Sequence, residues 1–224
     1  MHALDFDYMA GLVPILLGYL PLTLEMAAAA MVCALILSSL LAVIRVSRIP
    51  VLNGAAMLFI SFFRGTPLLV QLFLFYYGLP QIFSFLVSIN GITATIMGLT
   101  LHFSAYMAES IRAAIIGIDR SQTEAALSIG MTRAQLMRRI ILPQATRVAT
   151  PTLMNYFIDM IKSTSLAFTL GVTELMGATQ KEAAGSFLYF EAFLVVAVIY
   201  WVVVEALSWL QKWMEQRLNR AYQR

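Results

Sequence analysis

Long apolar runs separated by short polar and basic stretches form the dominant pattern along the chain. A helix needs about 20 mostly apolar residues to cross the roughly 30 Å hydrocarbon core of a bilayer. Stretches of about this kind occupy residues 19–44, 54–80, 91–118, 149–167 and 190–210. The pattern therefore predicts an all-α integral membrane protein with five transmembrane helices.

The second stretch contains a break. Its first part, Val51 to Phe63, is apolar but short, and Arg64-Gly65-Thr66-Pro67 follows. Proline suits the first turn of a helix, so the crossing effectively starts at Pro67 and runs to about Pro80. This interpretation places Arg64 near the inner face of the membrane.

Composition and charge agree with a membrane protein. Hydrophobic residues make up 60% of the chain and charged residues 12%, and the mean hydropathy is +0.80, which excludes an ordinary soluble domain. Basic residues flank the apolar runs, at Arg45 and Arg48, in the 112–147 connection, and in the tail. Six arginines lie in that connection: Arg112, Arg120, Arg133, Arg138, Arg139 and Arg147.

The positive-inside rule makes these basic stretches cytoplasmic. It predicts an external N-terminal segment over residues 1–18, a membrane domain over 19–214 and a cytoplasmic tail over 215–224. A helix ending near Gly18 is expected in the first of these, and a short helix with Lys181 and Glu182 in the outer connection 171–188. The net charge of +3 is explained by this loop bias, without nucleic acid as a partner.

The sequence contains no recognisable motif for catalysis, metal binding or nucleotide binding. The single cysteine, Cys33, offers neither a disulfide framework nor a cysteine-based metal site. The sequence has no G-x-x-x-x-G-K-[ST] phosphate loop, no metal-ligand spacing and no nucleophile–base arrangement. We therefore predict that the chain is not an enzyme and holds no cofactor. If the chain takes part in active transport, the energy must come from another subunit.

The stretch from Ser121 to Gln144 is the longest strongly polar, basic part of the chain. Ser121 suits an N-cap with Glu124 as its capping-box partner, and Gly130 suits a helix stop. A helix over about residues 122–129 is expected, with Ala125 and Ala126 giving it a surface that another protein can approach closely. A plain loop helix between two spans is the alternative.

Polar residues also interrupt the third and fourth apolar stretches. Asn155, Asp159, Lys162 and Ser163 fall on one side of a helix, and Asp159 and Lys162 either neutralise one another or face a cavity. Thr100 and Ser104 share a helix face, where they either line that cavity or pack helices together. We expect His102 to make a helix contact, and Glu109 to pair with Arg112.

Four segments resemble one family, the permease subunits of ABC importers. E-A-A at 124–126 with Gly130 and I-x-L-P up to Pro143 resembles the family's cytoplasmic loop. Three further segments resemble the polar amino acid branch of the family: FFRGTPLLVQLFLFYYGLP, AYMAESIRAA and IKSTSLAFTLGVTEL. Parts of their sequence are similar to cystine-type permeases. Ser163 departs from the family's K-D-T-S-L segment, which weakens the transfer of substrate residues.

The resemblance implies the type I importer permease architecture, with residues 122–129 as a coupling helix on an ATPase subunit. Glu124 would anchor that helix, Ala125 and Ala126 would permit close docking, and Gly130 would permit its sharp exit. Asp159, Asn155, Thr100, Ser104 and Ser163 would contact a polar amino acid, with cystine as the best guess.

The implied partners are ABC ATPase subunits that carry ATP and magnesium, a second permease subunit, identical or similar, and an extracytoplasmic solute-binding protein. The implied location is among the lipids of a bacterial cytoplasmic (inner) membrane, with the N-terminus outside. Two alternatives stay open: an ion-gradient-coupled secondary amino acid transporter using Asp159, Glu109 or Glu25, and a scaffold subunit.

Overall fold

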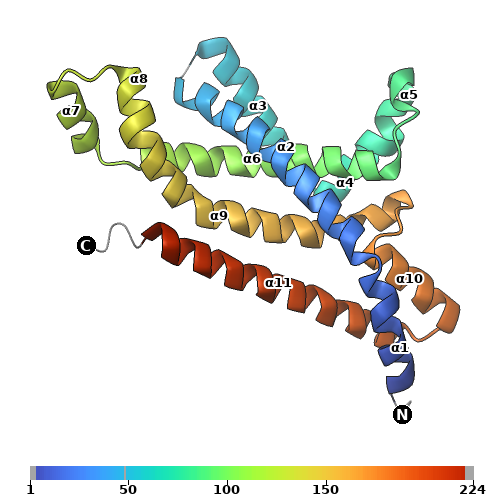
Figure 1. Cartoon of the computed structure of the whole chain (residues 1–224). Coiled ribbons are helices and arrows are strands. Elements are labelled where there is room, and N and C mark those ends of the chain that lie inside the picture. The colour runs from blue at the N-terminus through green and yellow to red at the C-terminus, as the bar shows by residue number, and fades with distance from the viewer. Residues whose placement is uncertain (1–3, 48, 220–224) are drawn as a thin grey trace.

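The computed structural model describes residues 4–47 and 49–219, and all regular structure within them is helical, which confirms the predicted all-α class. The four long helices are α2 (Leu20–Ser47), α6 (Gly91–Ile116), α9 (Leu142–Ser163) and α11 (Tyr189–Asn219). Figure 1 shows α6, α9 and α11 side by side, with α2 packed across α6 and α9. Shorter helices join them: α1 (Phe6–Leu17), α3 (Pro50–Gly65), α4 (Leu68–Phe73), α5 (Leu79–Ile82), α7 (Arg120–Ser128), α8 (Arg133–Leu136) and α10 (Leu175–Ser186).

Two described helices, α2 and α11, are long and apolar enough by themselves to cross a membrane, and α3 with α4–α5 makes a third crossing if the bent pair counts as one. Helices α6 and α9 are the central ones: α6 packs against α2, α3, α4 and α9, and α9 also against α11. A helix covered by its neighbours needs fewer apolar residues than one that faces lipid. The count of five spans stays a prediction.

The break in the second stretch is a sharp elbow. Helix α3 and the α4–α5 segment, which includes a π-helical turn at Leu74–Gly78, meet at an angle of 109° across Thr66 and Pro67. Arg64 lies at the far end of α3, about 20 Å along that helix from Pro50. Helix α3 therefore carries Arg64 away from the basic turn to the elbow, where its side chain is exposed, and the position of Arg64 near the inner face stays a prediction.

A buried glutamine holds the elbow. The side-chain amide of Gln71, which is 1% exposed, donates to the carbonyl oxygens of Phe63 (3.0 Å) and Thr66 (3.1 Å) and to the Thr66 hydroxyl (2.8 Å). Its Oε1 lies 3.1 Å from His102 Nδ1 on α6. The predicted helix-contact role of His102 is confirmed, and these bonds explain how a strongly bent segment satisfies its backbone groups.

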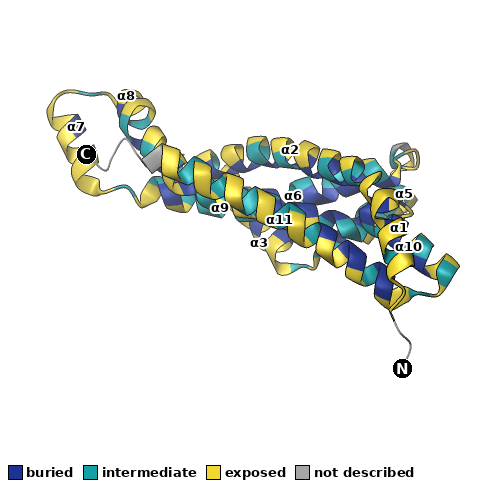
Figure 2. Cartoon of the chain, turned by 60° about the horizontal axis from the view of Figure 1, so that its bottom comes forward, coloured by how far each residue is buried: buried dark blue, intermediate teal, exposed yellow. Residues whose placement is uncertain are grey.

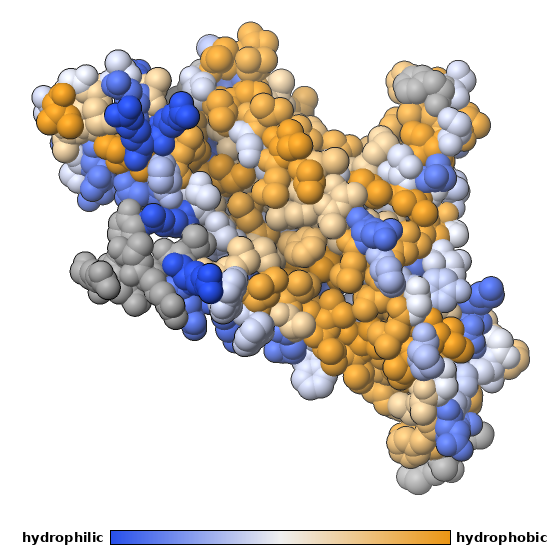
Figure 3. Space-filling view, in the orientation of Figure 1, coloured by the Kyte–Doolittle hydropathy of each residue, from blue (hydrophilic) through white to orange (hydrophobic). Residues whose placement is uncertain are grey.

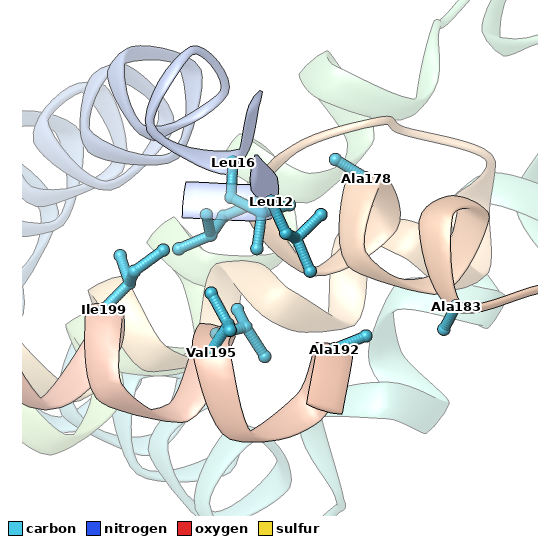
Figure 4. Packing of buried hydrophobic residues seen from close by; sticks show 9 residues of the cluster. Leu12, Leu16, Ala178, Ala183, Ala192, Val195 and Ile199 are labelled. Carbon is cyan, nitrogen blue, oxygen red and sulfur yellow. The ribbon is translucent and has the colours of Figure 1, made fainter. Parts of the chain in front are cut away.

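Small residues let the helices approach closely. Ala27, Ala30 and Ala34 of α2 pack with Leu99 and Phe103 of α6 in one buried cluster. At the opposite end of the molecule from α7, helices α1, α10 and α11 enclose a second cluster around Leu12, Leu16, Leu175, Ala178 and Val195 (Figure 4). The predicted helix end at Gly18 and the predicted short helix with Lys181 and Glu182 are both confirmed, and the location of that helix outside the membrane stays a prediction.

Polar residues gather at the two ends of the molecule. In Figure 3 a broad hydrophobic surface separates the polar region over α7 and α8 from the polar region over α1 and α10. This distribution is the one expected for a protein whose middle lies in a bilayer. Arg48, Arg220 and Arg224, which belong to the basic clusters of the sequence, lie outside the described residues.

Candidate functional site

Helix α7 begins one residue earlier than its expected cap. Its N-cap is Asp119, whose carboxylate accepts a 2.9 Å hydrogen bond from the Ser121 backbone N–H. Ser121 is already helical, so the predicted Ser121–Glu124 capping box is wrong. That hydrogen bond holds the pKa of Asp119 below its usual range. A capping box does occur in this loop, between Thr132 and Gln135 at the start of α8.

Gly130 ends α7, as predicted. Its φ is +80°, a conformation that residues with a Cβ rarely adopt. The Gly130 N–H donates to the Leu127 carbonyl (3.0 Å), and the Met131 N–H donates to the Ala126 carbonyl (3.1 Å). This pair of bonds is the Schellman arrangement, and it turns the chain sharply out of the helix.

The two alanines of this helix have different surroundings. Ala125 is exposed, whereas Ala126 is 2% exposed and packs in a cluster with Leu136 and Ile141. The expectation that both alanines offer a docking surface is therefore wrong for Ala126, which holds α7 against its own loop. The accessible face carries Ala125 and Ile129, four residues apart and so on one side, and Ile129 is 79% exposed. Glu124 is exposed as well. Figure 2 shows that most of α7 is exposed.

The polar residues of α9 come together as predicted. Asn155, Asp159 and Lys162 are exposed on one side of the helix, and Lys162 Nζ lies 2.7 Å from Asp159 Oδ1. The expected neutralisation of Asp159 by Lys162 is thus present, although the two side chains stay 52% and 51% exposed. Ser163 is half-buried, and its hydroxyl donates to the Asp159 carbonyl at 2.8 Å.

Thr100 and Ser104 do not join this group. The Thr100 hydroxyl donates to the Ala30 carbonyl of α2 at 3.4 Å, and Ser104 is fully buried with its hydroxyl bonded to the Leu101 carbonyl at 2.9 Å. In this conformation both residues pack α6 against its neighbours, and their contact with a substrate stays a prediction. The sequence left this second role open, and helix packing is the one observed.

Arg64 is a residue whose position the sequence did not reveal. It is exposed at the elbow, and its guanidinium carbon lies 5.4 Å from the centre of the Tyr106 ring on α6. The Tyr106 hydroxyl donates to the Arg64 carbonyl at 3.3 Å. The Tyr106 ring lies 6.2 Å from that of Tyr156, the neighbour of Asn155 on α9. Two tyrosines therefore connect the arginine to the polar face of α9.

Glu109 has the structural role expected of it, with an added partner. Arg112 donates twice to Oε2 (2.7 and 3.0 Å), which confirms the predicted local pair. Arg45 at the end of α2 donates to Oε1 at 3.3 Å and to the Asn53 side chain on α3 at 2.7 Å. Both carboxylate oxygens are engaged, and the group ties α2, α3 and α6 together.

A buried carboxylate organises the opposite end. Glu174 is fully buried and caps α10, accepting from the backbone N–H groups of Met176 (2.8 Å) and Gly177 (2.9 Å). Its other oxygen accepts from the hydroxyls of Thr23 on α2 (3.2 Å) and Tyr200 on α11 (3.4 Å). The only signal in the sequence was an acid just before a helix, which does not identify its distant partners.

Comparison with known proteins identifies the class. Residues 34–220 match the family described as the binding-protein-dependent transport system inner membrane component, and the chain belongs to this family. It is 68% identical to the probable amino-acid ABC transporter permease protein PatM of Vibrio harveyi, over 98% of this chain and 99% of that one.

Two further proteins that are similar to this chain are named with different compounds, L-cystine and histidine. The chain is 36% identical to the L-cystine transport system permease protein TcyL of Bacillus subtilis (strain 168), over 97% of this chain and 93% of that one. A chain in the crystal structure of an amino acid ABC transporter with histidines is also 36% identical, with a TM-score of 0.90 over 96% of this chain and all of that one.

These findings show an amino-acid ABC transporter permease subunit with the type I fold. It is a non-enzymatic membrane subunit, and ATP hydrolysis belongs to a separate partner. The family assignment disfavours the two alternatives left open by the sequence, an ion-gradient-coupled transporter and a scaffold subunit.

Proposed function

We propose that this chain forms, with a second permease subunit, the membrane path of an importer for a polar amino acid that an extracytoplasmic solute-binding protein delivers. ATP hydrolysis on partner ATPase subunits drives the cycle. The proposal includes a bacterial inner membrane location with α7 on the cytoplasmic side and α1 outside. The relatives named as amino-acid ABC transporter permeases support the substrate class.

The polar face of α9 is the observation that carries the proposal. Asn155, Asp159 and Lys162 are exposed on a helix that lies at the centre of the molecule. A charged side chain in contact with lipid at the middle of a bilayer costs about 3 kcal/mol even on insertion scales. This face therefore requires a cover that provides polar contacts, and a second permease subunit enclosing a hydrated path provides it.

The chemistry of the face suits an amino acid zwitterion. The Asp159 carboxylate complements an ammonium group, while Lys162 and the Arg64 guanidinium complement a carboxylate. The side-chain amide of Asn155 can both donate and accept. Because the Asp159–Lys162 pair is half exposed, a substrate can replace each partner by its own charged group without unpacking a helix.

Cystine remains the first compound to test, with histidine beside it. The permease named for L-cystine and the transporter with histidines are equally distant from this chain, at 36% identity. In the proposed path the substrate lies between two permease subunits, so the sequence identity of this one chain does not distinguish cystine from histidine.

For energy coupling, we propose that the exposed face of α7, with Ala125 and Ile129, docks on the ATPase subunit and that Glu124 contacts it at the rim. Gly130 and the buried Ala126 act within the chain, by fixing the angle at which α7 leaves the bundle. Either an identical or a similar second permease subunit would present a second such helix.

The test is uptake of labelled cystine and histidine by proteoliposomes that contain the transporter with its ATPase and binding protein. Asp159→Asn removes the charge that faces the substrate ammonium, and a charge-assisted hydrogen bond contributes about 2 kcal/mol, so uptake at low substrate should fall at least tenfold. Asp7→Asn, the same change on exposed α1, serves as the control and should leave uptake unchanged. Full uptake by Asp159→Asn, or uptake that follows an ion gradient without ATP, would contradict the proposal.

A further inference from the structure

A cavity of about 580 Å³ lies where the end of α2, the end of α6, helix α7 and the π-helical turn Met137–Ile141 meet. Three arginines line it, Arg45, Arg112 and Arg120, and its other walls are mostly apolar side chains such as Ile115 and Ile116. The cavity thus combines a cationic part with an apolar part. Its size is in the range of pockets that bind small molecules.

The cavity has more positive than negative charge. Glu109 is shared by Arg45 and Arg112, so this group of three carries one uncompensated positive charge. Arg120, at the start of α7, has no ion-pair partner within the described parts of the chain. It therefore adds a second uncompensated positive charge to the cavity. Arg45 and Arg112 are only 19% and 28% exposed, so their charges act in partly desolvated surroundings where an anion binds more strongly than in water.

The cavity lies away from the proposed substrate path. On α6 the path side carries Ser110, which bonds to Tyr156 of α9. Arg112 follows two residues later, and at about 100° per residue it points to nearly the opposite side of the helix. The anion site and the polar face of α9 are therefore separated by the thickness of α6.

We propose that this cavity binds the phosphate group of an anionic phospholipid, with the upper part of its acyl chains against the isoleucines. Guanidinium groups match phosphate geometry in pairs, and basic pockets between helices on the cytoplasmic side are suited to such head groups. The exposed Ile116 wall continues toward the bilayer, which a free anion would not need.

The bound lipid joins two parts of the protein. Arg45 and Arg112 belong to the bundle, whereas Arg120 and Thr123 belong to α7, the proposed coupling helix. A phosphate held between them fixes the position of α7 relative to the membrane helices, so an anionic bilayer favours productive coupling. The proposal rests on the proposed orientation, with α7 at the cytoplasmic leaflet.

The test is lipid binding by native mass spectrometry on the purified assembled transporter, titrated with phosphatidylglycerol and, in parallel, phosphatidylcholine. Arg120→Gln should weaken phosphatidylglycerol binding about fivefold, the contribution of one basic residue near an anionic head group, and Arg120→Lys should retain most of it. Arg133→Gln, an equal charge change on the same loop outside the cavity, should have no effect.

Hydrogen exchange of residues 120–128 in nanodiscs gives a second readout, and phosphatidylglycerol should protect them in the unmodified protein but not in Arg120→Gln. Unchanged binding by Arg120→Gln overturns the proposal, as does an equal loss in Arg133→Gln, which would indicate general surface charge. Displacement of the lipid by millimolar inorganic phosphate would indicate a soluble anion instead, and binding only after removal of the ATPase would show that the ATPase covers the cavity. Because these measurements need neither substrate nor ATP, their failure is distinct from a failure of the proposed transport function.

Discussion

Substitution of Gly130 tests whether the sharp exit of α7 matters for coupling. Its φ of +80° costs an alanine about 1–2 kcal/mol, since the Cβ approaches the following carbonyl. Apart from the local backbone, a Cβ built on Gly130 meets no atom within 4 Å, so the cost is one of backbone conformation alone. Asparagine and aspartate tolerate this conformation better, and valine tolerates it worst.

The expected order of damage is therefore Asn, then Ala, then Val. Strain at Gly130 acts on the two hydrogen bonds that end α7, those donated by Gly130 and Met131. For Gly130→Ala, exchange of the Met131 amide should accelerate about fivefold to thirtyfold, the equilibrium factor of 1–2 kcal/mol. Uptake per ATP hydrolysed should decline in the same order while thermal unfolding of the bundle stays unchanged. Aspartate adds a negative charge at a helix C-terminus, so any loss beyond that of asparagine reports on charge.

The control is Gly185→Ala on α10, where a Cβ also meets nothing within 4 Å but the backbone is helical. There alanine should be neutral or slightly stabilising. If asparagine, alanine and valine at position 130 all impair coupling equally, the backbone explanation fails, and contact of the added side chain with the ATPase becomes the cause.

Two further substitutions test the buried and half-buried acids. Glu174→Ala removes the cap of α10 and leaves the hydroxyls of Thr23 and Tyr200 without their acceptor, so the protein should lose about 3 kcal/mol, seen as a lower unfolding temperature in nanodiscs. An unchanged unfolding temperature would contradict this account. Glu109→Gln leaves two guanidinium groups facing one another and should cost about 2 kcal/mol after allowance for their partial exposure. Adding Arg45→Gln to the Glu109→Gln variant should restore part of the lost stability. A further drop in stability would refute the interpretation that Arg45 and Arg112 share the Glu109 carboxylate.

The helical class, the break at Pro67 and the helix stop at Gly130 were predictable because each depends on residues adjacent in the chain. The direction of the 109° elbow was not, since it depends on Gln71 meeting His102 across 31 positions. The burial of Ala126 beneath Leu136 and Ile141 likewise arises only when the loop folds back on itself. A short polar segment shows which residues are helical, but its three-dimensional contacts decide which side remains accessible.

The acids of α6 and α9, Glu109 and Asp159, show the same limit, and their partners in the structure distinguish them. Glu109 and Asp159 each stand three residues before a basic residue on a helix, so the local spacing of charges is the same for both acids. The structure gives Glu109 a second cation, Arg45 from another helix, and both its oxygens are engaged. Asp159 has Lys162 alone as an ion-pair partner among the described residues, and that pair is half exposed. In the proposed path a substrate ammonium can therefore take the place of Lys162 at Asp159, whereas at Glu109 the same exchange would break the Arg45 bridge between α2 and α6.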